Sequence, residues 1–108
     1  MDAKPGHERE LLSAEEIGDL AMTVPRWSLA GNAIEREFRL KDFREAIDFV
    51  NKIAEIAETM DHHPDICMYY NKVHLKLTTH KAGGLTHEDF ELAASIDRIQ
   101  SPVCDEVN

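Results

Sequence analysis

The feature that most constrains this chain is a long amphipathic segment, residues 43–60, between two pairs of short strand-like segments. Asp42 precedes this segment and can cap a helix, with Glu45 at the third helical position. Its apolar arc is broad, so it fits an oligomer contact as well as plain core packing. The residues at helical spacing are Phe43, Ile47, Val50, Ala54, Ala57 and Met60, with Phe49, Ile53 and Ile56 widening the stripe.

Strand-like alternation flanks this helix on both sides. Gly31-Asn32 and Asn71 are the turn signals inside the two pairs, which we therefore interpret as hairpins. Arg36 is a charged residue on an otherwise apolar strand face. Pro64 is expected to stop the long helix before the second pair begins. The expected strands are residues 27–30, 33–40, 66–70 and 72–79.

Two shorter helices complete the pattern. The first begins at Ser13 with Glu16 three residues later, and the last begins at Thr86 with Asp89 three residues later. The order α-β-β-α-β-β-α predicts an α+β fold, a four-stranded antiparallel sheet with three helices packed on one face. The length favours a single domain over residues 1–108, with 1–10 and 101–108 as loose tails.

The charge balance narrows the classes of function. The 108 residues carry a formal net charge of -9. Such a chain is repelled by phosphate backbones and anionic lipids, so we expect binding to neither nucleic acid nor membrane. Charged residues interrupt every apolar run, and the first ten residues are too polar for a signal peptide. With Cys67 and Cys104 in no metal-binding spacing, these features predict a soluble cytoplasmic protein.

Three histidines form the candidate site. His62 and His63 follow the long helix, and His80 ends the last expected strand. If the last two strands form a hairpin, their outer ends meet and His80 lies beside His63. Imidazoles titrate near about 6.5, so they can both give and accept protons at neutral pH. The remaining histidines, His7, His74 and His87, are expected to be solvated side chains.

Other chemistries fit the residues less well. Adjacent residues of an extended chain point to opposite faces, so His62 and His63 are poorly placed to share one metal ion. Neither cysteine stands near a histidine at a position that suggests a nucleophile, and Gly83-Gly84 reads as a turn rather than a phosphate loop. Asp89 can serve as the capping partner of Thr86, which remains an alternative to a role in catalysis.

The order of these residues resembles the pterin-4a-carbinolamine dehydratase family. The family pattern consists of an acidic residue, His-His-Pro, an aromatic residue, a histidine and an aspartate, in this order and at fixed spacings. This chain has the same order and spacings in Glu58, His62-His63-Pro64, Tyr70, His80 and Asp89. Further similar stretches are Lys41-Asp42-Phe43, Tyr70-Asn71-Lys72-Val73, Gly84-Leu85-Thr86 and Leu92-Ala93. The similarity extends from about Leu12 to Ile99. Family members often have an aromatic residue two positions after the proline, where this chain has Ile66.

The resemblance implies a dehydratase that needs neither metal nor organic cofactor. Its small-molecule partner is a 4a-hydroxytetrahydropterin, the product of aromatic amino acid hydroxylases, which loses water to give the quinonoid dihydropterin. It also implies assembly as a homodimer or homotetramer. We expect His63 and His80 to flank the leaving hydroxyl, and His62 to orient the pterin or to serve the other stereoisomer. The implied site residues are His62, His63 and His80 as catalytic groups, Glu58, Asp61 and Asp89 as supporting acids, and Trp27 and Thr79 as pocket lining.

Two other functions stay open at this point. Animal members of the family double as dimerisation cofactors of a transcription factor, so the broad arc of residues 43–60 also fits an interaction module that stabilises a protein partner. A family member without a hydroxylase to serve is expected to act on another pterin.

Overall fold

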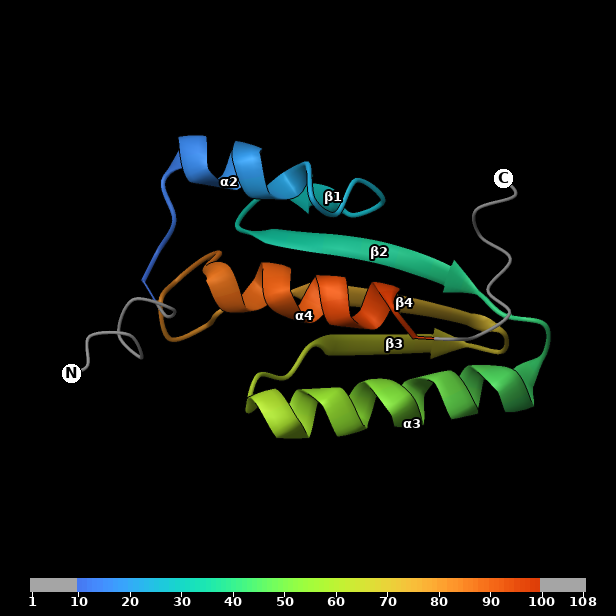
Figure 1. Cartoon of the computed structure of the whole chain (residues 1–108). Helices are drawn as coiled ribbons and strands as arrows, with labels where there is room; N and C mark the ends of the chain where they lie inside the picture. Colours follow the sequence, from blue (N-terminus) through green and yellow to red (C-terminus); the bar gives the residue numbers. More distant parts are fainter. Residues whose placement is uncertain (1–9, 100–108) are drawn as a thin grey trace.

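A computed structural model describes residues 10–99, which fold into three helices and four strands (Figure 1). The expected tails lie outside the described residues except for Glu10, and so do His7 and Cys104. No helix among the described residues is long and apolar enough to cross a membrane. The elements are α2 (Ala14–Ala21), β1 (Ser28–Ala30), β2 (Ala33–Arg39), α3 (Phe43–Met60), β3 (Asp65–Tyr69), β4 (Lys72–Leu77) and α4 (His87–Asp97).

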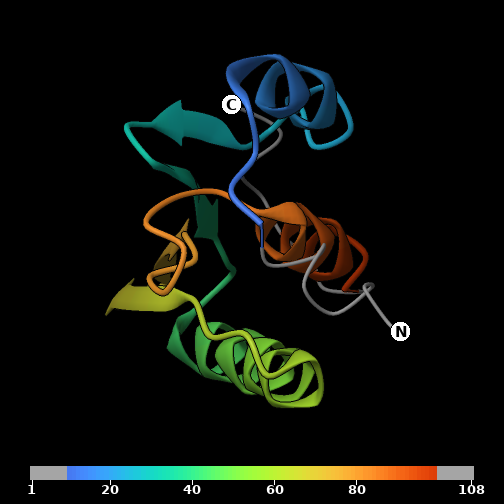
Figure 2. The same cartoon turned by 90° about the vertical axis from the view of Figure 1, so that its left-hand side faces the viewer.

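The four strands form one antiparallel sheet in the order β1-β2-β4-β3. The helices lie on one side of this sheet, as the end-on view of Figure 2 shows. The capping boxes expected at Ser13 and Thr86 are both present, and Asp42 caps α3. The predicted α+β class and its α-β-β-α-β-β-α order are therefore confirmed.

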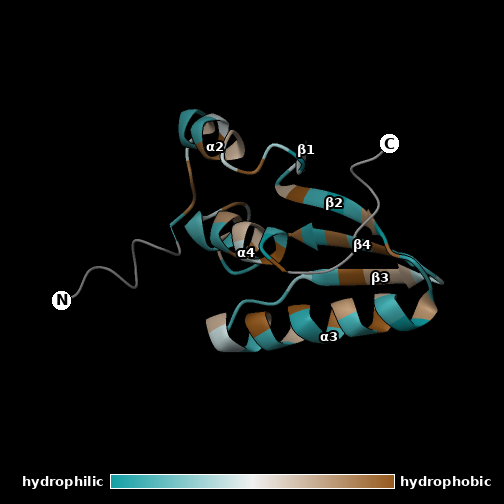
Figure 3. Ribbon diagram, turned by 45° about the vertical axis from the view of Figure 1, so that its right-hand side comes forward, coloured by the Kyte–Doolittle hydropathy of each residue, from teal (hydrophilic) through white to brown (hydrophobic). Residues whose placement is uncertain are grey.

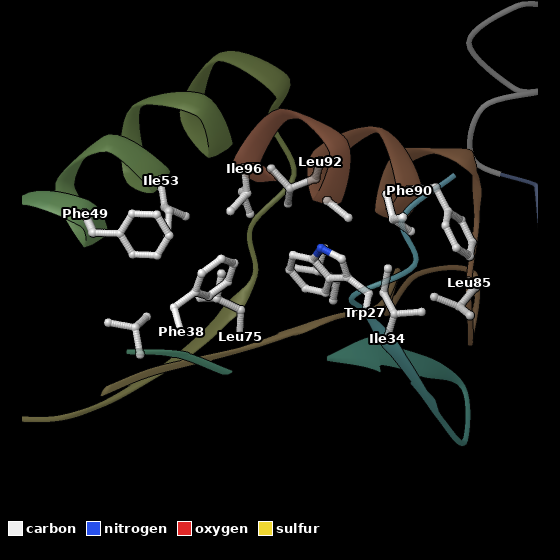
Figure 4. Close-up of a cluster of buried hydrophobic side chains, with 14 of the residues drawn as sticks. Trp27, Ile34, Phe38, Phe49, Ile53, Leu75, Leu85, Phe90, Leu92 and Ile96 are labelled. Atoms are coloured by element: carbon white, nitrogen blue, oxygen red, sulfur yellow. The ribbon is translucent and has the colours of Figure 1, made fainter. Parts of the chain in front are cut away.

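The core lies between the sheet and helices α3 and α4 (Figure 4). Phe38 of β2 packs against Phe49 of α3 with ring centroids 4.8 Å apart, and edge-on against Trp27 at 6.1 Å. The described chain buries these large side chains in one contiguous cluster, which fixes how α3 and α4 sit over the strands. Other buried members are Ile34, Leu75, Leu77, Ile53, Leu92 and Ile96.

Arg36, the unexpected charge in β2, does lie on the buried face of its strand. Its Nη1 donates to Oδ1 of Asp97, the last residue of α4, at 2.8 Å. The indole N–H of Trp27 donates to the same oxygen at 2.9 Å, and the guanidinium lies 4.1 Å from the centroid of Phe38. A buried charge is tolerated when it is paired and hydrogen-bonded, and this pairing ties β2 to α4.

Helix α3 turns a different part of its apolar arc toward the core than the sequence suggested. The buried residues are Ala46, Phe49, Ile53 and Ala57, so Phe49 and Ile53 are central rather than marginal. Phe43 is 51% exposed and Ile47 is 37% exposed. The ring of Phe43 stacks on the exposed ring of Tyr70, with centroids 6.5 Å apart. One sheet therefore leaves part of the arc uncovered. Figure 3 shows how hydrophobic residues recur along the whole of α3.

Candidate active site

A pocket lies where the segments that follow α3 and β4 meet, at one end of the molecule (Figure 1). Strands β3 and β4 pair with Asp65 opposite Lys76, so the residues before β3 come close to those after β4. The pocket has a volume of about 230 Å³ and is lined by Asp61, His62, His63, Thr78, Thr79, His80 and Lys81. The hairpin thus brings together the three histidines that the sequence singled out.

A left-handed residue at the end of α3 aims His62 into the molecule. Asp61 has φ 54° and ψ 43°. The backbone N–H of His62 donates to the carbonyl of Ala57 at 3.0 Å, and that of Asp61 to the carbonyl of Glu58 at 3.3 Å. These two bonds form a Schellman motif, which ends the helix ahead of Pro64. In the sequence Pro64 is the clearer stop signal, because an aspartate indicates the left-handed conformation less strongly than glycine does.

The imidazole of His62 is buried against the first turn of α4. Its Nε2 lies 2.6 Å from Oδ1 of Asp89, and its Nδ1 lies 3.3 Å from Oε1 of Glu88. Asp89 is fully buried, and its Oδ2 also accepts from the hydroxyl of Thr79 at 2.9 Å and from the backbone N–H of Thr86 at 3.0 Å. Asp89 therefore caps α4 and contacts a pocket histidine with one carboxylate, so both of its expected roles fit the geometry.

His63 points the other way and is mostly exposed. Its Nε2 lies 2.7 Å from Oε2 of Glu58, and the two side chains are 56% and 75% exposed. An ion pair this exposed adds little to stability. Its more useful effect is orientation, because an N–H donated from Nε2 leaves Nδ1 as the nitrogen that can exchange a proton.

His80 lies in a tight turn between β4 and α4. The backbone N–H of Thr79 donates to the carbonyl of Gly84 at 3.0 Å, and that of Gly83 donates to the carbonyl of His80 at 3.1 Å. Gly83 has φ 82°, a conformation that L-residues with a side chain rarely adopt. This compact turn holds the exposed imidazole of His80 at the rim of the pocket while Thr79, inside it, is buried.

Trp27 is not brought together with the histidines. Its indole is buried in the core and bonded to Asp97 at the end of α4, whereas the pocket abuts the start of that helix. Its expected place in the pterin pocket therefore has no support from the residues that line the pocket here. The structure assigns Trp27 a packing and hydrogen-bonding contact instead.

A second hollow of about 360 Å³ lies on the open face of the sheet, the face on which Glu35, Glu37 and Arg39 of β2 alternate with its core residues. It is lined by Arg26, Ser28, Glu35, Arg36, Glu37, Arg39 and His74. His74 is half-buried there, with Nε2 2.9 Å from Oε1 of Glu35. Nearby, a hydrogen bond with Cys67 raises the pKa of the exposed Tyr69 phenol. This larger hollow contains no member of the histidine set, and within residues 10–99 no group of three or more His, Cys, Asp or Glu is arranged to hold a metal ion.

Three residues near the site were not predicted from the sequence. Glu88 is the second carboxylate beside His62, and Thr78 and Lys81 line the pocket. Glu88 reads as an ordinary acidic residue of a helix's first turn, where acids are common. Its position in the sequence gave no signal, because adjacent side chains of a helix point in different directions and burial of a first-turn glutamate depends on what the helix packs against.

Known proteins of one family are similar to this chain over most of its length. Residues 10–99 match the family model for pterin 4 alpha carbinolamine dehydratase. A protein of Sulfurisphaera tokodaii, provisionally named pterin-4-alpha-carbinolamine dehydratase, is 51% identical over 82% of this chain and 95% of its own length. One of a Picosynechococcus species with the same provisional name is 53% identical over 82% and 96%.

Solved structures show the same fold. A transcriptional coactivator/pterin dehydratase from Brucella melitensis superposes with a TM-score of 0.76 at 33% identity, covering 80% of this chain and 94% of that one. A pterin dehydratase-like RuBisCO assembly factor of the alpha-carboxysome has a TM-score of 0.55 at 19% identity, covering 67% and 83%, which supports the fold alone.

Proposed function

The chain belongs to the pterin 4 alpha carbinolamine dehydratase family, whose members are hydro-lyases, and we propose that it dehydrates its pterin through His63 and His80. The observation that supports the proposal is that two exposed imidazoles line one small pocket. One follows α3 and the other follows β4, so the two proton-transfer groups come from different segments of the chain.

The reaction needs two proton transfers. The C4a–O and N5–H bonds of the 4a-hydroxytetrahydropterin break, a C4a=N5 double bond forms, and water leaves. Hydroxide is a poor leaving group because the pKa of water is about 15.7, so a protonated imidazole donates to the hydroxyl as the C–O bond breaks. The other imidazole accepts the N5 proton. Each transfer is typically worth roughly 10²- to 10⁴-fold in rate.

Each histidine has a neighbour that suits this work. Glu58 accepts from Nε2 of His63, which fixes the tautomer and leaves Nδ1 for the substrate. The turn closed by Thr79 and Gly84 holds His80 in place. Asp61 supports the site by the left-handed turn that ends α3 ahead of His62, and Thr79 by its bond to Asp89. The proposed metabolic setting, regeneration of the pterin used by aromatic amino acid hydroxylases, rests on the family resemblance.

The direct test of this function is the absorbance change of a synthetic 4a-carbinolamine mixed with the pure protein. We expect the conversion to the quinonoid dihydropterin to be faster than in buffer by at least the factor of roughly 10² that a single proton transfer supplies. A rate equal to the buffer rate would contradict the proposal. Comparing pterins with different side chains in the same assay identifies the preferred substrate.

We also propose that the chain assembles as a homodimer or homotetramer through the uncovered side of α3, where Phe43 and Ile47 are exposed. Large exposed apolar side chains on one helix face are typical of an interaction surface. Sedimentation equilibrium is expected to give two or four times the chain mass, and Ile47→Glu is expected to shift it toward the monomer. Asp48→Asn, on the adjacent exposed position, is the control.

A second candidate function uses the same surface. A module that stabilises a protein partner needs these α3 residues accessible, and the similar Brucella protein is described as a transcriptional coactivator as well as a pterin dehydratase. A monomer in sedimentation, unchanged by Ile47→Glu, would contradict self-association and favour this second function.

A further inference from the structure

The turn that holds His80 is bonded to a second turn of the sheet. Strands β2 and β4 are paired, so the β1–β2 turn at residues 31–32 lies beside the residues that follow β4. The hydroxyl of Thr78 donates to the backbone carbonyl of Asn32 at 2.7 Å. The side-chain amide of Asn32 also donates to the carbonyl of Gly83 at 3.4 Å, which is a long and weak bond. Asn32 therefore bonds to the chain on both sides of His80.

The chain segment ahead of α2 holds the end of the same turn. The backbone N–H of Leu12 donates to the carbonyl of Leu85 at 2.9 Å. Gly84 is buried, and a Cβ at this position would lie 3.0 Å from Cδ1 of Leu11 and 3.6 Å from Cβ of Asn32. The two neighbouring segments thus fit closely against the turn, and a glycine leaves room for them.

The imidazole of His80 depends on this turn for its position. Within residues 10–99 no side chain is hydrogen-bonded or ion-paired to it, whereas His63 has Glu58 at 2.7 Å. The place of the ring therefore follows from where the turn puts the backbone of His80. Proton transfer requires hydrogen-bond contact with the reacting group, and a misplacement of about 1 Å can lower a rate by roughly 10²-fold.

The bond from Thr78 to Asn32 involves no substrate. Thr78 lines the pocket, but a threonine hydroxyl has a single proton to donate, and this one is donated to Asn32. Asn32 is exposed and lies outside the lining of the pocket. An effect of this bond on catalysis therefore acts through the turn and not through a hydrogen bond that Thr78 donates to the pterin.

We propose that the hydrogen bond from Thr78 to Asn32 positions His80 for proton transfer, so that Thr78 and Asn32 are positioning residues for the dehydration. The bond fixes the start of the turn two residues before His80, and the contacts of Leu11 and Leu12 fix its end. Without the bond the ring leaves the position from which it reaches the reacting atoms. The other walls of the pocket stay in place, so the loss falls on kcat rather than on KM. That His80 transfers a proton rests on the proposed function.

The test compares Thr78→Val, which replaces the hydroxyl with a methyl group, with Thr78→Ser, which keeps the hydroxyl. We expect Thr78→Val to lower kcat for a synthetic 4a-carbinolamine by about tenfold and to change KM by less than about twofold. Thr78→Ser is expected to restore most of the lost rate. Thr23→Val is the matched control, because the hydroxyl of Thr23 donates to the carbonyl of Leu20 at 2.6 Å just after α2, and it is expected to leave both constants unchanged. A thermal melt checks that each variant is folded.

Hydrogen exchange measures the turn itself, without substrate. The backbone N–H of Thr79 donates to the carbonyl of Gly84 at 3.0 Å, and that of Gly84 donates to the carbonyl of Thr79 at 3.3 Å. Exchange at these two amides is expected to be about fivefold faster in Thr78→Val than in wild type, the factor that corresponds to the loss of one hydrogen bond.

Equal exchange rates in Thr78→Val and wild type would overturn the proposal, and so would an unchanged kcat in an active protein. A higher KM at constant kcat would mean that the hydroxyl binds the substrate, which also overturns it. A loss of rate that Thr78→Ser does not restore would show that the hydroxyl is not the group that matters. A wild type without dehydratase activity would contradict the proposed function, and the exchange rates would still decide whether this bond holds the turn.

Discussion

Replacing both His63 and His80 with alanine is expected to lower kcat for dehydration by roughly 10⁴-fold or more, because each proton transfer contributes roughly 10²- to 10⁴-fold. Both side chains are exposed, so the fold is expected to keep its stability within about 0.5 kcal/mol. The loss in rate then reports chemistry rather than unfolding. Stopped-flow absorbance of the 4a-carbinolamine measures the rate, and a thermal melt checks the fold.

The single variants and a control sharpen this result. If the two rings handle different protons, either single substitution is expected to remove most of the acceleration, and the two effects are not expected to add. His74→Ala removes an imidazole from the hollow on the open sheet face and is expected to leave the rate unchanged. A double variant within tenfold of wild type would show that other groups carry the chemistry.

Asp89→Ala is expected to destabilise the protein by about 3 kcal/mol or more, because each buried donor left without its acceptor costs about 1–3 kcal/mol. Asp89 is the acceptor for three donors at once: His62, the hydroxyl of Thr79 and the backbone N–H of Thr86. Its removal costs α4 its capping box and takes from His62 the carboxylate that lies 2.6 Å from its Nε2. Urea denaturation measures the change as a lower midpoint.

A matched series separates the contributions of Asp89. Asp89→Asn keeps an acceptor oxygen but places an NH₂ among three donors, so we expect an intermediate loss of stability. Glu91→Ala, on the exposed side of the same helix, is expected to change the free energy of unfolding by about 0.5 kcal/mol or less. An Asp89→Ala midpoint equal to that of wild type would mean that the buried network is not formed.

The order of the elements could be predicted because local signals agree with one another. The boxes at Ser13 and Thr86, the cap at Asp42 and the turn at Gly31-Asn32 each depend on residues close in sequence. Which side of α3 faces the core could not be predicted in the same way. Its arc is apolar on two sides, and tertiary packing, such as that of Phe38 against Phe49, decides which side is buried.

The proximity of the three histidines in the candidate site could be predicted from the sequence, and their contacts could not. Hairpin topology is enough to bring His80 toward His62 and His63, which the pocket bears out. The different exposures of His62 and His63 fit the alternation expected of an extended chain, whereas the left-handed conformation of Asp61 ahead of them is poorly indicated by the sequence. Glu88 escaped notice because burial of a first-turn glutamate depends on what α4 packs against. Trp27 was placed in the pocket by resemblance, whereas its indole bonds to Asp97.

The most direct test of proton transfer by His63 is chemical rescue of the His63→Ala variant with added imidazole. The ring of His63 is 56% exposed, so its removal opens space that a free imidazole can enter from solvent. We predict that the dehydration rate rises with imidazole concentration, and that substituted imidazoles of different basicity rescue to different extents. A rate that stays at the level of the variant at every imidazole concentration would contradict the assignment of His63 as a proton-transfer residue.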